Sequence, residues 1–414
     1  MKRKLIIYGW LAQLVLFGCT NEKIEIKPVL NAVTNISVCS GSAIGTINFS
    51  ANTGGGEVFT WTNTNSAINL GAEGTGNILA FTATLNTSGV PIMGTISVQG
   101  KKNNLTSQSI SFTITVEPEP VVAALDNRSF SSGATVNVPL TSNMPGSVQN
   151  WTNSNTKIGL PASGTGDIIY TAPVNNTNSD VTGIIIVTGT SNGCSSTGKN
   201  QKAFAITIKS LAHCLLAWYP FTGNASDSSG NNYNGAVYGA TLTTDRFGNA
   251  NSAYSFDGAS NCISSANINL SGSSTISVWV YPIGSIGALV DKNKDAIDHA
   301  GYALIYNNPL HGIYAHVGWS GDSSNNVLPN PIDSLAVGNW HHCLLTYSNG
   351  TASLFLDGSL IYTRTGLNPI TQNNDLLLFG KSVWGGNVFQ GKLDEIRLWN
   401  RVITNDEIQY LYAH

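Results

Sequence analysis

Short runs of β-branched and aromatic residues, interrupted by glycine or asparagine roughly every ten residues, are the main feature of this 414-residue sequence. Apolar and polar residues alternate within the runs, as in 110–116 and 203–208, which is the pattern of a strand with one buried face. The 43 glycines and 14 prolines break any longer apolar period, so a mostly helical fold is excluded. We therefore expect an all-β protein.

Charged residues are scarce in this chain. They make up 10% of it, against about 25% in a typical soluble domain, and 20 basic and 23 acidic residues leave a net charge of −3. No basic stretch could neutralise a run of phosphates, so nucleic acid is disfavoured as a partner. The composition instead favours an exported or surface-displayed protein.

The first 18 residues predict export. Residues 2–4 are basic, and the apolar run 5–17 that follows is too short for a comfortable membrane span. Leu-Phe-Gly-Cys at 16–19 resembles a bacterial lipobox, which implies that Cys19 is acylated and tethers the chain to the outer membrane or cell surface. The alternative is an ordinary signal peptide with an incidental cysteine. Which side of the membrane the chain faces stays open.

An internal repeat organises the middle of the chain. Residues 61–78 and 151–168 are identical at 11 of 18 positions, beginning with Trp-Thr-Asn and including Gly-Thr-Gly. Glu-Pro-Glu-Pro at 117–120 separates the two copies as a short, extended linker. Two small Greek-key sandwiches are therefore predicted. Trp61 and Trp151 are interpreted as core residues of these sandwiches, with a sugar-stacking platform as the alternative.

The two copies resemble the PKD-like domains found in tandem in surface proteins of Bacteroidetes-type bacteria. Besides the repeated motifs, the resemblance rests on residues 39–41 near the start of the first copy and 192–194 near the end of the second. It implies a spacer or interaction role. The first copy keeps only Cys39 and the second only Cys194, so a bond within one copy is impossible. Whether these two cysteines pair with each other stays open.

The third segment resembles a LamG-like or concanavalin A-like jelly roll. In chain order, the motifs that carry the resemblance are residues 217–221, 254–258, 275–280, 338–342, 354–360 and 391–400. The resemblance implies a two-sheet sandwich, and such relatives include lectins, carbohydrate-binding modules, adhesion domains and, in one branch, glycoside hydrolases. The predicted organisation is a signal peptide at 1–18, a tether at 19–29, PKD-like domains at 30–118 and 121–210, and a jelly roll at 212–414.

Hydrolysis is not expected of this jelly roll. Retaining glycosidases need two carboxylates roughly 5–5.5 Å apart, which a strand supplies at positions i and i+2. From residue 213 onward the only glutamates are Glu395 and Glu407, and Glu407 falls in a terminal helix that we expect Thr404 to cap. Glu395 adjoins Asp394, so on a regular strand the two side chains point to opposite faces. The sequence therefore predicts a protein that is not an enzyme.

Calcium is the one cofactor that the sequence suggests. Asp227 follows the first strand of the jelly roll and Asp394 lies in the last, and these strands are expected to be neighbours. With the loop near Asn231, the two carboxylates would form an oxygen site, and many relatives of this fold bind a structural calcium ion. The alternative is that Asp227 makes an Asx turn. The stretch 291–295 copies three EF-hand positions but lacks the later glycine and glutamate, and it is interpreted as a solvated loop.

Three further cysteines belong to the jelly roll. Cys214 and Cys262 are predicted to lie near strand ends, where the geometry of a disulfide is easiest to meet, and export favours oxidation. A Cys214–Cys262 bond is therefore predicted. Cys343 lies in an apolar strand and is predicted to stay reduced as a small buried hydrophobe.

The predicted function is carbohydrate binding by the jelly roll. Trp319 and Trp384 lie in glycine-rich segments and Tyr314 shortly precedes the first of them, and loop aromatics often stack on sugar rings. We therefore expect a non-catalytic, lipid-anchored surface protein whose partner is a polysaccharide or a glycoprotein. The alternatives are an adhesion protein that binds protein partners and a targeting module for a polysaccharide-degrading system.

Overall fold

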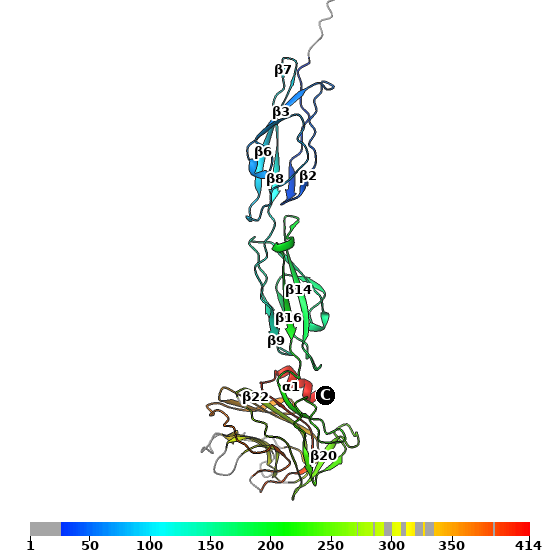
Figure 1. The fold of residues 1–414 in the computed structure, drawn as a ribbon, viewed down its shortest axis with the longest axis vertical. Coiled ribbons are helices and arrows are strands. Elements are labelled where there is room, and N and C mark those ends of the chain that lie inside the picture. Colours follow the sequence, from blue (N-terminus) through cyan, green and yellow to red (C-terminus); the bar gives the residue numbers. More distant parts are fainter. Residues whose placement is uncertain are drawn as a thin grey trace, which may run out of the picture. The chain divides into compact units, whose positions relative to one another are not determined.

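In the computed structural model the chain is almost entirely β-structure (Figure 1). The structure describes residues 26–270, 272–284, 286–293, 300–307, 312–318, 326–327, 335–383 and 386–414. It divides into two compact units. The first takes in residues up to Val121 with Ser142–Ser147 and Gly189–Asn200, and the second takes in Val122–Thr141, Val148–Thr188 and Gln201–His414. In the described part of the chain, no helix is long and apolar enough to cross a membrane.

The first copy of the repeat folds as a small sandwich. Its larger sheet has the order β1 (Ile36–Cys39), β8 (Ile110–Glu117), β6 (Ile92–Lys102), β3 (Val58–Asn63) and β4 (Glu73–Thr75), with β7 (Leu105–Thr106) beside β6. The smaller sheet pairs β2 (Ala43–Ile44) with β5 (Phe81–Thr82). The edge strand β1 runs parallel to β8, while the pairs β8–β6, β6–β3 and β3–β4 are antiparallel.

The second copy repeats this topology. Its larger sheet has the order β9 (Arg128–Phe130), β16 (Lys202–Ile208), β14 (Val181–Ser191), β11 (Val148–Asn153) and β12 (Ser163–Thr165), with β15 (Cys194–Ser195) beside β14. Its smaller sheet pairs β10 (Thr135–Val138) with β13 (Ile168–Thr171). Strand β9 again runs parallel to its neighbour β16. The repeat in the sequence is therefore a repeat of the fold.

The repeated tryptophans are core residues, as the sequence predicts. Trp61 and Trp151 belong to the buried clusters of their sandwiches and are 8% and 7% exposed. Each lies directly opposite the first glycine of the Gly-Thr-Gly motif, Gly74 or Gly164, on the adjacent strand. A Cβ atom at either glycine would collide with the indole ring. The motif is therefore not a turn but a strand that is kept free of side chain at the point where the ring packs.

The structure contains a different disulfide from the one that the sequence predicts. Cys39 and Cys194 form a disulfide, with their Cα atoms 5.4 Å apart, and both belong to the first unit. The predicted Cys214–Cys262 bond is absent, because both thiols are free. Cys214 precedes a strand of one jelly-roll sheet, and Cys262 begins a strand of the other. Packed sheets lie about 10 Å apart, whereas a disulfide needs Cα atoms within about 7 Å, so the predicted pairing is corrected.

The jelly roll consists of two antiparallel sheets. The first sheet has the order β19 (Thr241–Thr243), β20 (Ala253–Asp257), β31 (Gln390–Trp399), β22 (Ser274–Pro282), β27 (His341–Ser348), β28 (Thr351–Leu356) and β29 (Ser359–Arg364), with β17 (Leu215–Tyr219) also paired to β31. The second sheet has the order β18 (Ala236–Tyr238), β21 (Cys262–Ser264), β30 (Leu378–Phe379), β23 (Ile286–Asp291), β24 (Gly301–Asn307), β25 (Gly312–Gly318) and β26 (Asn326–Val327). The first and last strands, β17 and β31, are neighbours as expected.

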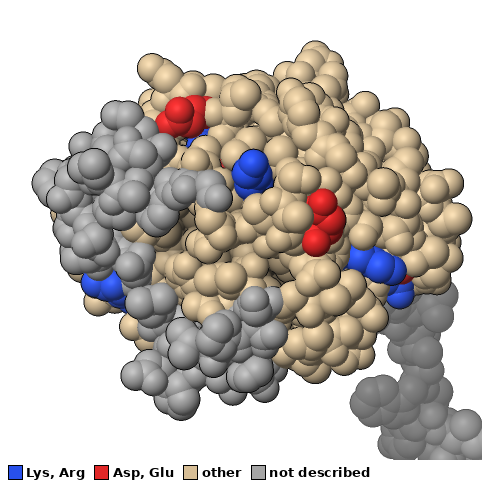
Figure 2. All heavy atoms as spheres, turned by 90° about the horizontal axis from the view of Figure 1, so that it is seen from below, with Lys and Arg blue, Asp and Glu red and all other residues tan. Residues whose placement is uncertain are grey.

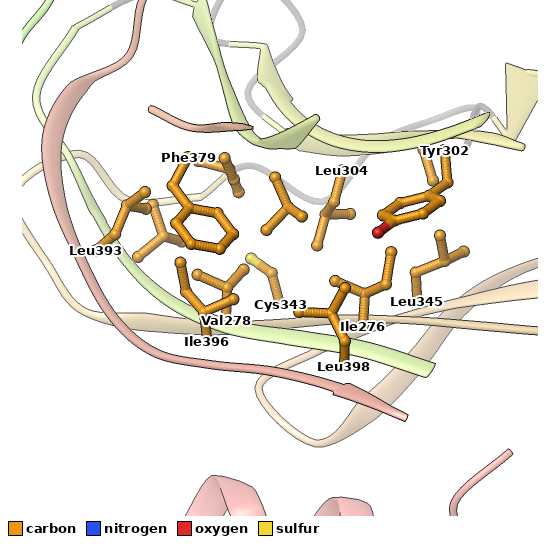
Figure 3. Close-up of a cluster of buried hydrophobic side chains, with 14 of the residues drawn as sticks. Ile276, Val278, Tyr302, Leu304, Cys343, Leu345, Phe379, Leu393, Ile396 and Leu398 are labelled. Atoms are coloured by element: carbon orange, nitrogen blue, oxygen red, sulfur yellow. The ribbon is translucent and has the colours of Figure 1, made fainter. Parts of the chain in front are cut away.

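The core of the jelly roll lies between these sheets (Figure 3). Ile276 and Val278 of the first sheet face Leu304 and Phe379 of the second, and all four are buried. Cys343 points into the same layer as a free, fully buried thiol, which confirms its predicted state. Burial raises the pKa of this thiol well above its usual value, so it behaves as an apolar side chain.

Helix α1 (Asn405–Ala413) covers part of the outer side of the first sheet (Figure 1). Thr404 caps it in a capping box with Glu407, as the sequence predicts. Ile408 and Leu411 pack on Leu344 and Trp399 of the sheet. The outer side of the first sheet is thus partly a second, smaller core.

Candidate functional site

The outer face of the second sheet is built by strand alternation and one bulge. In β24, Ala303, Ile305 and Asn307 point away from the core, because Tyr302, Leu304 and Tyr306 point into it. Ala303 pairs with Asp291 of β23 and His316 of β25, and Ile305 pairs with Ala288 and Tyr314. A bulge between Ala288 and Val290 sends Leu289 and Val290 both to the core. Ala288 and Asp291 consequently share the outer face.

Tyr314 lies on an apolar patch of this face. Its half-buried ring packs on Ala288, Ala303 and Ile305, whose side chains are small enough to leave the ring above the sheet. Burial, helped by the negative charge of Asp291, raises the pKa of the Tyr314 hydroxyl, which therefore stays protonated at neutral pH. The structure thus places Tyr314 on a sheet face, whereas the sequence analysis grouped it with loop aromatics.

Buried oxygen acceptors flank this patch. Asp291 is 1% exposed, and its Oδ1 accepts a hydrogen bond from the Asn293 amide at 2.8 Å. Among the described residues, no donor with good geometry reaches Oδ2 of Asp291 or Oδ1 of Asn307. Burial raises the pKa of Asp291 to about 6, although the Asn293 amide, the Ser382 side chain and the Val383 amide approach the carboxyl and partly offset this rise. A ligand that brings hydroxyl donors would satisfy both acceptors.

Trp319 and Trp384, the other two predicted ligand-binding residues, lie outside the described part of the chain. Trp319 directly follows β25, the strand that carries Tyr314. Trp384 follows Ser382, which approaches Asp291. Their role stays a prediction.

The predicted calcium ligands are engaged with protein groups. Asp227 accepts hydrogen bonds from the backbone N–H groups of Trp218, Ser229 and Tyr233 and from the Ser229 hydroxyl, at 2.8–3.0 Å. Asp227 thus makes an Asx turn, which the sequence analysis gave as the alternative to calcium binding. Asn231 donates its amide to the carbonyl oxygens of two β17 residues, Leu215 and Leu216. Nowhere in the described residues do three His, Cys, Asp or Glu side chains gather as a metal site, and calcium at these three residues stays a prediction.

Asp394 and Glu395 correct an expectation from the sequence. They do not point to opposite faces, because Glu395 has φ +51° within a bulge of β31 opposite β22. Leu393 and Ile396 face the core, while both carboxylates lie on the outer side of the first sheet. Asp394 pairs with Arg246 at 3.1 Å, and Glu395 pairs with Arg397 at 2.7 Å. Burial and the nearby charge of Glu395 raise the pKa of Asp394 to about 8.

A cavity of about 370 Å³ opens beside these carboxylates. Its wall includes Asp394, Glu395, Thr222, Arg246, Phe247 and Asn249. The Arg246 guanidinium lies between the rings of Phe247 and Trp279, at 4.3 and 4.5 Å from their centroids. The sequence analysis missed Arg246 and Phe247, although their five-residue segment Asp-Arg-Phe-Gly-Asn between two short strands is a loop signal that presents an aromatic residue.

The adjacent histidines of β27, His341 and His342, point to opposite sides of the sheet, as successive residues of a strand do. His341 contacts Asp357 through Nδ1 at 2.8 Å, which raises the pKa of the imidazole. His342 is buried on the outer side of the first sheet, with Nε2 2.8 Å from the Ser277 hydroxyl. Burial, together with the positive charges of Arg397 and Arg246, lowers its pKa to about 3 despite Asp357 nearby.

The buried His342 predicts a pH dependence of stability. Its folded pKa lies below the unfolded value of about 6.5, so its contribution is complete above that pH and is lost as the pH falls toward 3. Between pH 6.5 and 5 this loss amounts to ~2 kcal/mol of unfolding free energy. Urea unfolding at several pH values checks it, with His342→Asn as the comparison because Asn does not titrate. Parallel pH profiles of the two proteins would contradict it.

Comparisons with known proteins identify the fold of the C-terminal domain. Residues 256–409 match a family model described as the concanavalin A-like lectin/glucanases superfamily. A search of curated proteins found no match. Among solved structures, domain 4 of AbnA, an extracellular GH43 arabinanase from Geobacillus stearothermophilus in complex with arabinotriose, is similar at 20% identity and a TM-score of 0.40, over 48% of this chain and 98% of that domain.

Two toxin domains are also similar in structure. The ligand-binding domain of botulinum neurotoxin serotype D, in complex with N-acetylneuraminic acid, has 15% identity and a TM-score of 0.39, over 49% of this chain and 51% of that one. The binding domain of Paraclostridial Mosquitocidal Protein 1 has 19% identity and a TM-score of 0.39, over 49% and 52%. This chain therefore spans only about half the length of either toxin domain.

Proposed function

Because the C-terminal domain is a jelly roll of the concanavalin A-like lectin/glucanase type, we propose that it binds carbohydrate on the outer face of its second sheet. One observation carries the proposal. Tyr314 lies on an apolar patch between two buried oxygen atoms, Asp291 Oδ2 and Asn307 Oδ1, for which the described residues supply no donor with good geometry. A sugar ring has an apolar C–H face for stacking and hydroxyl groups for donation, so it matches both features.

The ligand is expected to carry little charge. Figure 2 shows one face of the molecule, on which the described Lys, Arg, Asp and Glu side chains are few and scattered. Only 10% of the chain is charged, and the described residues on the face in Figure 2 form no basic cluster that would attract a polyanion. A neutral polysaccharide or the glycan of a glycoprotein fits this surface better than an acidic polymer.

We propose binding rather than hydrolysis. Retaining glycosidases need a pair of carboxylates about 5–5.5 Å apart. Among the described residues of the outer face of the second sheet, Asp291 is the one carboxylate. Asp394 and Glu395 do share a face of the first sheet, but each is paired with an arginine, Arg246 or Arg397. A single buried carboxyl suits hydrogen bonding to a hydroxyl group.

The proposal extends to display at the cell surface. It rests here on sequence alone: the basic residues 2–4, the apolar run 5–17 and the lipobox-like sequence before Cys19. In this arrangement the two repeated sandwiches are spacers between the lipid anchor and the jelly roll. Cys19 lies outside the described residues, so its acylation remains a proposal.

Substitution of Tyr314 tests the binding face. Tyr314→Ala is expected to weaken polysaccharide binding about tenfold, because it removes the stacking ring but leaves the sheet intact. Affinity electrophoresis of the full chain in gels containing soluble arabinan, xylan, galactan or glucan measures the effect. Tyr238→Ala is the matched control, since Tyr238 is 57% exposed on β18 of the same sheet.

Two results would contradict the proposed function. Equal retardation of Tyr314→Ala and the unsubstituted chain would place the binding site elsewhere. Absence of retardation in every gel, followed by absence of binding on a glycan array, would favour the alternative of a protein-binding adhesion domain.

A further inference from the structure

The cavity beside Arg246 belongs to the first sheet, which makes it separate from the Tyr314 face. We propose that this cavity, called here the Arg246 pocket, is a second carbohydrate site that takes one neutral sugar ring. The inference does not depend on the proposed function of the Tyr314 face, since the two sites lie on different sheets.

The pocket has an exposed aromatic ring held in place. Phe247 is 63% exposed, although the Arg246 guanidinium covers one face of the ring. Asp245 fixes the loop by accepting hydrogen bonds from the backbone N–H groups of Phe247 and Asn249 and from the Asn249 side chain, at 2.8–2.9 Å. Gly248 completes the turn with φ +85°. A rigid loop therefore presents the ring for stacking at the edge of the cavity.

The polar wall of the pocket is also held in place. Arg246 donates to Asp394 Oδ2 at 3.1 Å and to the His414 carbonyl oxygen at 2.6 Å, and Asp394 is 2% exposed. Glu395 joins this wall only because its backbone takes φ +51°, a conformation that costs a non-glycine residue free energy. The bulge thus brings Glu395 to the wall of the cavity, where its Oε2 accepts a hydrogen bond from Trp218 Nε1 at 2.8 Å and pairs with Arg397.

The charges of the wall determine which ligands fit the pocket. The carboxylates of Asp245 and Glu395 line the cavity, so an anion would be repelled. Arg246 forms part of the same wall, which disfavours a bare cation. A neutral ring with several hydroxyl groups can donate to the carboxyl groups, accept from the guanidinium and stack on Phe247. The cavity of about 370 Å³ is at the small end of ligand sites, as expected for one sugar ring.

Free monosaccharides test the pocket in the full chain. Saturation-transfer NMR with glucose, galactose, mannose, arabinose, xylose and N-acetylglucosamine is expected to show binding of at least one of them. Glucuronate is the charged comparison and is expected to bind at least tenfold more weakly than glucose or galactose. The signal is expected to persist in Tyr314→Ala, because that residue belongs to the other sheet.

Variants of Phe247 separate stacking from folding. Phe247→Leu is expected to weaken monosaccharide binding at least tenfold, while Phe247→Tyr, which keeps the ring, retains it. Both variants are expected to melt within a few degrees of the unsubstituted chain, since the side chain is mostly exposed.

Three results would overturn the Arg246 pocket: no signal from any neutral monosaccharide, an undiminished signal in Phe247→Leu, or loss of the signal in Tyr314→Ala. Monosaccharide binding without polysaccharide retardation would contradict only the function proposed for the Tyr314 face.

Discussion

Reduction of the Cys39–Cys194 disulfide is expected to lower the free energy of unfolding of the region it closes by about 5 kcal/mol at 25 °C. The bond joins residues separated by 155 positions, and a loop of that length greatly restricts the unfolded chain. Differential scanning calorimetry with and without reductant, and of a Cys39→Ser, Cys194→Ser double variant, measures the loss.

The control for this experiment is Cys214→Ser. Cys214 is exposed and free, so its replacement is expected to leave the unfolding transition unchanged in either condition. Labelling of thiols without reductant is expected to modify Cys214 and to spare Cys39. If reduction leaves the melting profile of the unsubstituted chain unchanged, the disulfide does not stabilise the fold as described.

Gly301→Ala is expected to destabilise the jelly roll by about 4 kcal/mol. Gly301 begins β24 with φ +114°, and a Cβ there would collide with the carbonyl oxygen of Lys292. That oxygen accepts a hydrogen bond from Asn373 Nδ2 at 2.7 Å, and Asn373 Oδ1 in turn accepts one from Lys292 Nζ at 2.6 Å. A shift of the backbone would separate the fully buried Lys292 ammonium group from the Asn373 side chain that accepts its hydrogen bond.

Gly366→Ala is the matched control. Gly366 also has a positive φ, +76°, but nothing lies within 4 Å of the position that its Cβ would take. Its substitution is expected to cost only about 1 kcal/mol, the backbone penalty without the collision. Chemical denaturation of the two variants compares them, and equal losses would show that the Lys292–Asn373 network tolerates displacement.

The regular parts of the fold follow from local patterns. The Asp-Gly pair at 357–358 has positive φ at both residues and joins β28 to β29, and Asp-Gly is a residue pair that favours such a hairpin turn. Thr404 caps α1, and the 90-residue repeat becomes two sheets of equal strand order. These features need only neighbouring residues, so a single sequence contains their cause.

The candidate sites depended on departures from those patterns. A strict period of two places Asp394 and Glu395 on opposite faces, but a bulge puts both on one face. A second bulge, after Ala288, brings Asp291 to the face that carries Tyr314. The sequence analysis interpreted 291–295 as a solvated loop, which is wrong for its first three residues, because they are buried. A bulge adds one unpaired residue to a strand, and nothing in the residue types of these strands marks its position.

Alternation, turn residues and the internal repeat were enough to determine an all-β chain with two small sandwiches, and the resemblance of the motifs in the third segment implied the jelly roll. The tertiary structure decided which cysteines are bonded, which side chains share a face, and that Arg246 and Phe247 meet Asp394 across 147 or more residues of chain. Strand periodicity is a local property of the backbone. Disulfide partners and binding sites depend on distances between sheets and on strand registers, which exist only after the sheets have packed.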